Sequence, residues 1–377
     1  MSKKILVTGG AGFIGSHLVD SLIEKGHEVR VYDCLVQENY KNQQDPPDYC
    51  SNEAEFILGD MKDYNHLQDA IAGVDVIFHL AAALGIGRSM YMIRRFINNN
   101  TLGTANLLDI LANCEHDVAK LVIASSCSLY GEGTVLCPNC GRFNPEMRTR
   151  DQMKRKNWDI MCPTCGKATQ WSPVSEKDPV DCTSIYAYSK YHQEHMSMLV
   201  GKTYGIETTA LRFFNVLGPR QALSNPYTGV CAIFATSALC GNPPLVYEDG
   251  MQARDFVNVF DVVQALNLTL NSSNADGQIF NVGTGEATTI LDLCRQVVKS
   301  INPEIHIQTT EKGRYGDVRN IIADISKIKR ELGYQPQYTF EDSVEMVLAW
   351  IKNNYNKDDV CDRTQDAKKD LVDKGII

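Results

Sequence analysis

Thr8-Gly9-Gly10-Ala11-Gly12-Phe13-Ile14-Gly15 is a glycine-rich turn between a β-branched run, Lys4–Thr8, and a stretch with helical apolar spacing at 13–25. Glycine allows a tight turn and a close approach of the backbone to a pyrophosphate, and the amino end of the following helix attracts negative charge. A strand before the turn and a helix after it are the context that this fingerprint requires. The stretch therefore predicts a dinucleotide site, with contacts from Gly9, Gly12, Phe13, Ile14 and Gly15.

Asp33 follows the next expected strand, at 28–32. An acidic residue about 20 positions beyond the glycines accepts the adenosine ribose hydroxyls in NAD-binding folds. No arginine comes directly after Asp33 to receive the 2′-phosphate of NADP. We therefore expect NAD as the cofactor.

The first third of the chain alternates short β-branched runs with helical patterns, which is typical of βαβ units. This alternation predicts an α/β fold, a Rossmann-type doubly wound parallel sheet with a smaller C-terminal lobe. Further strands are expected at 55–58, 76–80, 120–124 and 207–211. Helices are expected at 64–72, 99–114, 185–204, 261–270, 289–301 and 340–353.

The same patterns divide the chain into parts. Residues 1–215 are expected to form the NAD-binding Rossmann domain, interrupted by a polar, cysteine-containing insert at 134–170. Residues 216–355 have less regular segments punctuated by prolines, and we expect them to form mainly a substrate-binding lobe. Residues 356–377 are charged and carry little apolar surface, so they are expected to form a surface helix or a loose tail.

The composition, 44% hydrophobic and 22% charged, is that of a soluble globular protein. The amino terminus shows no export signal, and no apolar run approaches the roughly 20 residues of a membrane-spanning helix. A formal net charge of −9 argues against a general nucleic-acid binder. We therefore expect a cytoplasmic protein whose partners include neither nucleic acid nor membrane, and in which local arginines or backbone amides bind any anionic ligand.

Tyr186 and Lys190 lie four residues apart at the start of an expected helix and so share one of its faces. An ammonium beside a phenol lowers the phenol pKa, which would make Tyr186 an acid and base near neutral pH. Such a pair alone recurs by chance. Ser126, however, ends the fifth expected strand, and ligands of open α/β sheets bind at the carboxyl ends of the strands. Together these three residues predict a catalytic site.

The chain resembles the extended short-chain dehydrogenases/reductases of the nucleotide-sugar epimerase/dehydratase type. The resemblance covers about residues 1–350. It is carried by the glycine turn, His79-Leu-Ala-Ala82, Asn100-Thr-Leu-Gly-Thr104, Ser126 to Gly131, Tyr186 with Lys190, Arg212-Phe-Phe-Asn215, Arg254-Asp-Phe-Val257, Asn281-Val-Gly283 and Arg314-Tyr-Gly-Asp317.

This resemblance implies a role for each matching residue. Tyr186 would be the base, Ser126 would hold the substrate oxygen, and Lys190 would bind the nicotinamide ribose. The other implied cofactor contacts are Asp60 and Met61 at the adenine, Leu80, Ala81 and Ala82, and Asn100 near the nicotinamide. The implied contacts to the substrate diphosphate are Asn215, Arg254 and Arg314. The resemblance also implies a homodimer.

Simpler roles remain open for the three diphosphate residues. Asn215 could cap a turn, Arg254 could pair with Asp255, and Arg314 could pair with Asp317.

The residues after Ser126 narrow the reaction. Dehydratases of this type carry an Asp-Glu pair there, and this chain has Cys127-Ser128, which disfavours dehydration. Cys127 is also one position away from the cysteine of 3,5-epimerases and related reductases, so we expect it to pack. The remaining machinery suits 4-epimerisation of a nucleotide sugar.

Ser89-Met-Tyr91, Ser128-Leu-Tyr-Gly-Glu132 and the stretch 218–229 resemble the dTDP-L-rhamnose 4-epimerases. Three alternatives remain: a UDP-sugar 4-epimerase, an NAD(P)H-dependent dTDP-4-keto-sugar reductase, and a dinucleotide-sensing regulator. Sensors of this fold often lack the tyrosine, which disfavours the last.

Two Cys-x-x-Cys-Gly motifs lie in the insert, at Cys137 and Cys140 and at Cys162 and Cys165. Each such turn aims two thiolates at one point, and two turns complete a tetrahedral zinc site. Four thiolate ligands leave no open position for a catalytic water, so we expect a structural zinc ribbon. A redox pair or a disulfide is the alternative. The insert connects Ser126 to Tyr186, and it could cover the pocket or shape a subunit contact.

Overall fold

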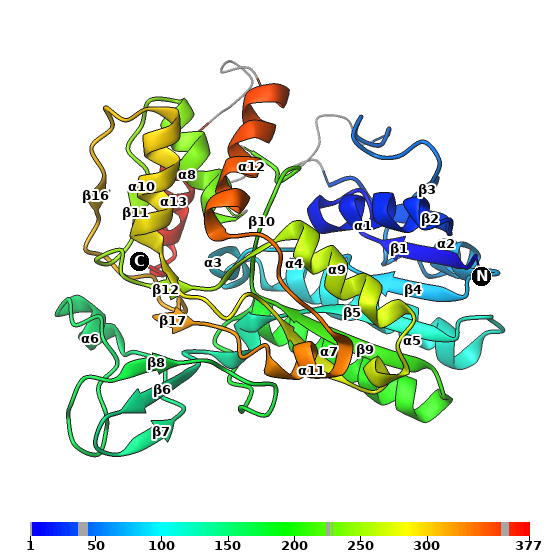
Figure 1. Cartoon of the computed structure of the whole chain (residues 1–377), viewed down its shortest axis with the longest axis horizontal. Helices are drawn as coiled ribbons and strands as arrows, with labels where there is room; N and C mark the ends of the chain where they lie inside the picture. The colour runs from blue at the N-terminus through cyan, green and yellow to red at the C-terminus, as the bar shows by residue number, and fades with distance from the viewer. Residues whose placement is uncertain (1, 37–43, 224–226, 228, 356–361) are drawn as a thin grey trace.

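The computed structural model describes residues 2–36, 44–223, 227, 229–355 and 362–377. Its centre is a sheet of seven parallel strands in the order β14-β9-β5-β4-β1-β2-β3 (Figure 1). The strands are β1 (Lys4–Thr8), β2 (Glu28–Asp33), β3 (Glu55–Leu58), β4 (Val76–His79), β5 (Lys120–Ser126), β9 (Glu207–Phe213) and β14 (Ile279–Val282). The strand order reverses direction at β1, which lies between β2 and β4.

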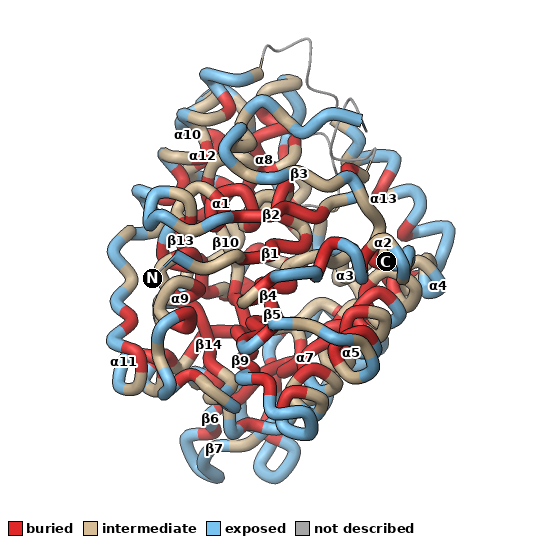
Figure 2. Tube along the Cα trace, turned by 90° about the vertical axis from the view of Figure 1, so that its right-hand side faces the viewer, coloured by how far each residue is buried: buried red, intermediate tan, exposed pale blue. Residues whose placement is uncertain are grey.

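Helices cover both faces of this sheet. Helices α1 (Phe13–Glu24) and α9 (Val259–Leu270) pack on one face, and α2 (Tyr64–Ile71), α5 (Gly103–Asn113) and α7 (Ile185–Tyr204) pack on the other. Ile5 and Val7 of β1 belong to the first core and Leu6 to the second, because side chains of a strand alternate between faces. Figure 2 shows the central strands largely buried between the two helical layers. The predicted Rossmann-type fold is confirmed.

The sheet draws on more of the chain than the sequence pattern indicates. Strand β14 pairs with β9, with Ile279 opposite Ala210, and it lies in the segment 216–355. Helix α9, from the same segment, packs on α1. This segment therefore contributes to the Rossmann layers as well as to the second lobe. A run of four residues, three of them apolar, does not distinguish a buried strand from part of a helix, so the pattern does not reveal β14.

The helix expected at 99–114 begins earlier, at Ile93, and changes from α-helical to π-helical hydrogen bonding and back. After the short helix α3 (Ile86–Ser89), α4 (Ile93–Phe96), the π-helical turn η1 (Ile97–Leu102) and α5 follow one another directly. Single π turns are rare and occur frequently at functional sites.

The second lobe packs around its own core, formed by α8 (Val230–Leu239), α10 (Ile290–Ile301) and α12 (Phe340–Asn354). Three small sheets lie outside the central sheet and the insert. They pair β10 (Asn215–Leu217) with β13 (Phe256–Asn258), β11 (Leu245–Val246) with β16 (Gln308–Thr309), and β12 (Ala253–Arg254) with β15 (Thr288–Thr289) and β17 (Asn320–Ile321). The remaining short helices are η2 (Cys127–Tyr130), η3 (Ser273–Ala275) and α11 (Ser326–Leu332).

The cysteine-containing insert forms a three-stranded antiparallel sheet with β6 (Thr134–Cys137) between β7 (Gly141–Phe143) and β8 (Gln170–Ser172). A short helix, α6 (Arg150–Lys154), lies between β7 and β8 in the chain. Figure 1 shows the insert at one end of the molecule, beside β12 and β17.

The carboxyl-terminal residues are neither a loose tail nor poor in apolar contacts. Helix α13 (Thr364–Asp373) buries Ala367 and Leu371, and Ile376 is buried after it. Ala367 and Leu371, four residues apart, lie on one face of a helix that is otherwise mostly polar. Residues 356–361 lie outside the described part of the chain. Among the described residues, no helix combines the length and apolar character that crossing a bilayer requires.

Candidate active site

One large cavity, of about 2030 Å³, opens at the carboxyl ends of β1, β4 and β5. This is the position where doubly wound sheets bind ligands, next to the reversal of strand order. Its volume exceeds the roughly 300–1,000 Å³ of a pocket for one small molecule. It can therefore hold a dinucleotide and a second ligand together. With one exception, Asn100, the predicted cofactor, catalytic and substrate residues line it: Gly9, Gly12, Phe13, Ile14, Gly15, Asp33, Asp60, Met61, Leu80, Ala81, Ala82, Ser126, Tyr186, Lys190, Asn215, Arg254 and Arg314.

The glycine turn requires glycine at two of its positions. Gly9 has φ +72°, and a Cβ there would lie 2.9 Å from the backbone of Ala81. A Cβ on Gly15 would lie 2.2 Å from the carbonyl oxygen of Gly9. Helix α1 begins at Phe13 without a side-chain cap, so its first N–H groups face the cavity end of the turn. This geometry fits a diphosphate, as the sequence predicts.

Asp33 ends β2 beside the turn. Its carboxylate accepts hydrogen bonds from the backbone N–H of Ala11, at 3.1 Å, and of Leu35, at 2.9 Å. Burial raises the pKa of Asp33, and these N–H groups oppose that effect. The bonds fix the carboxylate at the cavity wall, where it can accept ribose hydroxyls. Asp60, the predicted adenine contact, forms an ion pair with Lys62 at 3.1 Å on the same wall.

Tyr186 lies in the first turn of α7, which Ser184 caps. The Tyr186 backbone N–H donates to the hydroxyl of Ser89 at 3.0 Å. Burial raises the pKa of Tyr186 to about 12, and the Ser126 hydroxyl, close to the phenol oxygen, partly opposes this. The end of β5 and the start of α7 thus bring the predicted serine and tyrosine together.

Lys190 is 3% exposed, and its Nζ donates to Oε1 of Gln193 at 2.9 Å. Burial lowers the pKa of Lys190 to about 7, and Glu194 partly opposes this. Burial has the largest effect on the pKa of both groups, and Lys190 is not among the causes of the Tyr186 shift. Burial disfavours the charged form of each group, the phenolate of Tyr186 and the ammonium of Lys190, and a neighbouring group offsets only part of this effect. The expected lowering of the Tyr186 pKa by Lys190 stays a prediction.

Asn100 does not line the cavity. It is fully buried in the π turn, where its side chain accepts from the Ala83 backbone N–H at 2.6 Å and donates to the Ser189 hydroxyl at 2.8 Å. Asn100 therefore connects the loop after β4 to helix α7, instead of reaching a ligand. The steadying role near the nicotinamide that the resemblance implies for Asn100 stays a prediction.

Arginines gather at the opposite end of the cavity. Arg254 donates to the carbonyl oxygens of Val318, at 2.7 Å, and Arg319, at 3.0 Å. The alternative pairing of Arg254 with Asp255 is wrong, because Asp255 accepts from Thr284 instead. Arg314 does pair with Asp317, at 2.7 Å, and also lies over the ring of Tyr247. Arg314 therefore both pairs with Asp317 and lines the cavity.

Asn215 starts β10, and its backbone N–H donates to the Asp255 carbonyl oxygen at 3.0 Å. Its position in a strand disfavours the role of a turn cap, which the residues alone left open.

Two residues after Ser126 also line the cavity. The thiol of Cys127 has its pKa raised to about 12 by burial, so it is not a ready nucleophile. It packs against the core as expected while still reaching the wall. The Ser128 hydroxyl is buried without a hydrogen-bond partner in the described structure. A buried polar atom without a partner favours a ligand group there, and only the structure reveals it.

Helix α13 supplies a further part of the cavity wall through Arg363, Lys368 and Leu371. No motif in the charged sequence of 356–377 indicates this.

The four insert cysteines converge. Their Sγ atoms all lie within 4.8 Å of one another, and those of Cys137 and Cys165 are 3.5 Å apart. The twelve described cysteines are all free thiols, so the disulfide alternative has no support here. The cluster can coordinate one metal ion of tetrahedral preference.

Two protein families match the chain. The NAD dependent epimerase/dehydratase family matches residues 5–149, and the GDP-mannose 4,6 dehydratase family matches residues 165–347. The dTDP-L-rhamnose 4-epimerase of Burkholderia thailandensis is 32% identical over 362 residues, covering 94% of this chain and 96% of that protein. A putative UDP-glucose 4-epimerase of Methanocaldococcus jannaschii is 34% identical over 356 residues, covering 93% and 99%.

A solved structure is similar over the same length. The UDP-glucuronic acid 4-epimerase of Bacillus cereus, in complex with UDP-glucuronic acid and NAD, matches with a TM-score of 0.74 and 27% identity, covering 93% of this chain and 100% of that one. The chain belongs to the NAD-dependent epimerase/dehydratase family of extended short-chain dehydrogenases/reductases. The relatives named here are, more narrowly, nucleotide-sugar 4-epimerases, which are isomerases.

Proposed function

We propose that this protein is an NAD-dependent nucleotide-sugar 4-epimerase that acts on dTDP-L-rhamnose or a related dTDP-6-deoxyhexose. The observation that carries the proposal is the position of the Ser126–Tyr186 pair. It lines one cavity together with the glycine turn and with Arg254 and Arg314. A sugar with its diphosphate toward the arginines can then present a hydroxyl to Tyr186.

The residues at the glycine turn fit NAD. Gly9 and Gly15 leave the space that a diphosphate needs, Asp33 offers a fixed carboxylate for ribose hydroxyls, and Lys190 would bind the second ribose. When bound, NAD⁺ supplies the acceptor and donor for the C4 hydride, and its positive charge favours the ionised form of a nearby phenol.

The protein residues handle the proton. Tyr186 takes the C4 hydroxyl proton as the sugar is oxidised and returns it when the 4-keto sugar is reduced on its opposite face. Ser126 hydrogen-bonds to the same substrate oxygen and keeps it beside the phenol. The cavity of about 2030 Å³ leaves room for the keto sugar to turn between the two half-reactions. Nothing is consumed in the cycle, so no external reductant is needed.

Dehydration requires an additional acid and base near C5 and C6. The two residues after Ser126 are a thiol of raised pKa, Cys127, and a hydroxyl, Ser128, and neither can replace the carboxylates of a dehydratase at neutral pH. The family match to GDP-mannose 4,6 dehydratases covers residues 165–347, so it does not include Ser126 and the two residues after it. Epimerisation fits the residues better.

The choice of sugar rests on a narrower similarity. The Burkholderia relative and the motifs Ser89–Tyr91 and 128–132 support a dTDP-6-deoxyhexose. In the third motif, 218–229, residues 224–226 and 228 lie outside the described part of the chain. The Methanocaldococcus relative supports a UDP-sugar as the second candidate.

Incubation of the purified protein with dTDP-L-rhamnose or with UDP-galactose, without added nicotinamide, separates these candidates. We expect the C4 epimer of the dTDP-sugar to accumulate to an equilibrium ratio, as followed by NMR of the anomeric protons. Turnover of only the UDP-sugar supports the second candidate. If neither sugar turns over, and NADH or NADPH is instead oxidised when a dTDP-4-keto-6-deoxyhexose is supplied, the protein is a reductase and the epimerase proposal is wrong.

We also propose that Cys137, Cys140, Cys162 and Cys165 hold a structural zinc ion. The convergence of their sulfur atoms supports this, and four thiolates satisfy the coordination of zinc without an open position.

We further propose a homodimer formed through α5 and α7. These two helices pack against each other, and Leu102, Tyr188 and Leu199 expose 46%, 50% and 65% of their surface beside them. Large apolar residues exposed along one helical layer favour a protein contact.

A further inference from the structure

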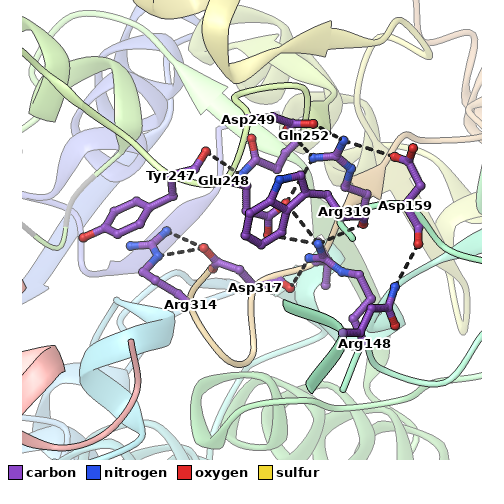
Figure 3. Close-up of polar contacts among 12 residues, drawn as sticks. Arg148, Asp159, Tyr247, Glu248, Asp249, Gln252, Arg314, Asp317 and Arg319 are labelled. Atoms are coloured by element: carbon purple, nitrogen blue, oxygen red, sulfur yellow. Dashed lines mark hydrogen bonds and ion pairs between the residues drawn. The ribbon is translucent and has the colours of Figure 1, made fainter. Parts of the chain in front are cut away.

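Arg148 belongs to the cysteine-containing insert but lies deep inside the protein. It is 2% exposed, and its side chain lies beside Glu248, Asp317 and Arg319 (Figure 3). Its guanidinium bonds to four residues. Nε donates to Glu132 at 2.8 Å and Nη2 to the carbonyl oxygen of Asp317 at 2.9 Å. Nη1 donates to both carboxylate oxygens of Glu248 at 3.0 Å and to the carbonyl oxygen of Trp158 at 3.2 Å. An arginine fork can make these bonds simultaneously, whereas a single ammonium cannot.

The carboxylates around Arg148 are buried as well, and a second arginine balances them. Glu132 and Glu248 expose 0% and 1% of their side chains. Arg319 donates from its backbone N–H to Glu132 at 2.6 Å and from Nη1 to Glu248 at 3.0 Å. Arg148 and Arg319 thus share the carboxylate of Glu248, and Arg319 also pairs with Asp249 and Asp159. Removing one partner would leave a buried charge uncompensated.

This network holds residues 311–319, which contain no helix or strand and which we call the arginine loop. Glu248 pairs with the loop through its backbone and has φ +53°, a conformation that costs energy for a residue other than glycine. Met153 and Trp158 of the insert lie against Gly313, where a Cβ would come within 3.2 Å of both side chains. The insert therefore contacts the loop on both sides of Arg314.

The arginine loop in turn fixes the two arginines of the cavity. The Asp317 carboxylate binds Arg314, and the carbonyl oxygens of Val318 and Arg319 bind Arg254. Figure 3 shows Asp317 between Arg314 and Arg148, with its carboxylate toward Arg314 and its backbone toward Arg148. The position of both cavity arginines thus depends on a loop that Arg148 holds from outside the cavity.

We propose that Arg148 is a positioning residue for nucleoside-diphosphate binding, through which the insert sets the geometry of Arg254 and Arg314. The proposal rests on the function proposed above, since it takes the cavity arginines to bind the diphosphate of the sugar nucleotide. It gives the insert a role in substrate affinity while leaving the proton chemistry at Tyr186 to the Rossmann layers. The expected signature is a loss of affinity for nucleoside diphosphate and a higher KM, with NAD affinity retained.

Arg148→Lys tests this with little risk to folding, because the positive charge among the buried carboxylates is kept. Lysine can pair with Glu132 or Glu248 but cannot also hold the Asp317 carbonyl oxygen. Arg142→Lys is the matched control: Arg142 also anchors the insert, but its side chain bonds to Ser172, Pro173 and Asp178. Glu248→Gln is a second variant that removes one charge from the same network without changing its shape.

Titration with UDP and with dTDP by calorimetry, and with NAD by fluorescence quenching, gives the readout. We expect Arg148→Lys to bind the nucleoside diphosphates about tenfold more weakly, a change within the range by which packed networks couple neighbouring sites. We expect its NAD affinity, and both affinities of Arg142→Lys, to stay at the wild-type value. Glu248→Gln should also weaken nucleoside-diphosphate binding, and in both network variants KM should rise more than kcat falls.

Equal UDP and dTDP affinity in wild type, Arg148→Lys and Glu248→Gln would overturn the positioning role. So would an equal loss in Arg142→Lys, which would point to a general effect of loosening the insert. If the wild-type protein itself binds neither UDP nor dTDP, the proposed function is wrong and the positioning role falls with it. The wild-type titration therefore distinguishes the two failures.

Discussion

Loss of the insert metal is expected to follow from replacing one buried cysteine, Cys162→Ser. Zinc–sulfur bonds of about 2.3 Å place the sulfur atoms of a tetrahedral site about 3.8 Å apart. The four Sγ atoms already lie within 4.8 Å of one another, and one pair is at 3.5 Å, so only small side-chain rotations separate this cluster from a tetrahedral site. Structural zinc contributes about 10–16 kcal/mol to small zinc domains at pH 7. This matches the whole stability of a typical domain, about 5–15 kcal/mol.

The insert should therefore lose its fold when the metal is lost. We expect elemental analysis to find one zinc per chain in wild-type protein purified without chelator, and about a tenth of that or less in Cys162→Ser. Limited proteolysis should then cleave Cys162→Ser within the insert and spare the rest of the chain. Cys114→Ser, which changes a cysteine outside the cluster, should retain the metal and resist cleavage. Wild-type protein without metal but with a protease-resistant insert would refute the reasoning.

Three further outcomes follow from the geometry. Asp33→Asn should weaken NAD binding about 10- to 100-fold, because hydrogen bonds to a charged group contribute about 1.5–3 kcal/mol each; an unchanged fluorescence titration would contradict the role of Asp33. Burial lowers the pKa of His79 to about 3, with a smaller contribution from Lys190. Because the unfolded chain binds this proton more readily, the free energy of unfolding keeps its full value above about pH 6.5 and falls as the pH is lowered toward 3. Urea unfolding should thus show a loss of about 2 kcal/mol at pH 5 that His79→Gln lacks, and equal losses in both proteins would count against it. Leu199→Glu should turn the proposed dimer into monomers by light scattering, whereas Glu304→Lys, at a distant exposed position, should not; a monomeric wild type would exclude the dimer.

Much of the fold and the catalytic site follows from local sequence patterns. The strand, turn and helix around Gly9–Gly15 are contiguous in the chain, and so are Tyr186 and Lys190 on one helical turn. The position of Ser126 follows from a general rule about the ends of parallel strands. Each of these signals depends on neighbouring residues or on a repeated unit, and that is why the sequence alone identifies it.

What the sequence does not reveal depends on long-range packing. The four-residue strand β14 joins the sheet because β9 offers an open edge, and α13 buries Leu371 against Gly87, far away in the chain. The pKa of Tyr186 is set by burial, which the spacing of two residues cannot predict. In the sequence, Arg148 looks like one of several basic residues of the insert, and only the fold shows that it is buried and bonded to Glu132, Trp158, Glu248 and Asp317.

Tyr186→Phe tests the central claim most directly. The phenol oxygen beside Ser126 is the proposed acid and base, and general acid–base groups contribute about 10²- to 10⁴-fold to the rate. With dTDP-L-rhamnose, or with UDP-galactose if that is the sugar turned over, the account predicts that Tyr186→Phe loses epimerisation by at least about a hundredfold while binding NAD and the nucleoside diphosphate like wild type. Wild-type turnover in Tyr186→Phe would contradict it.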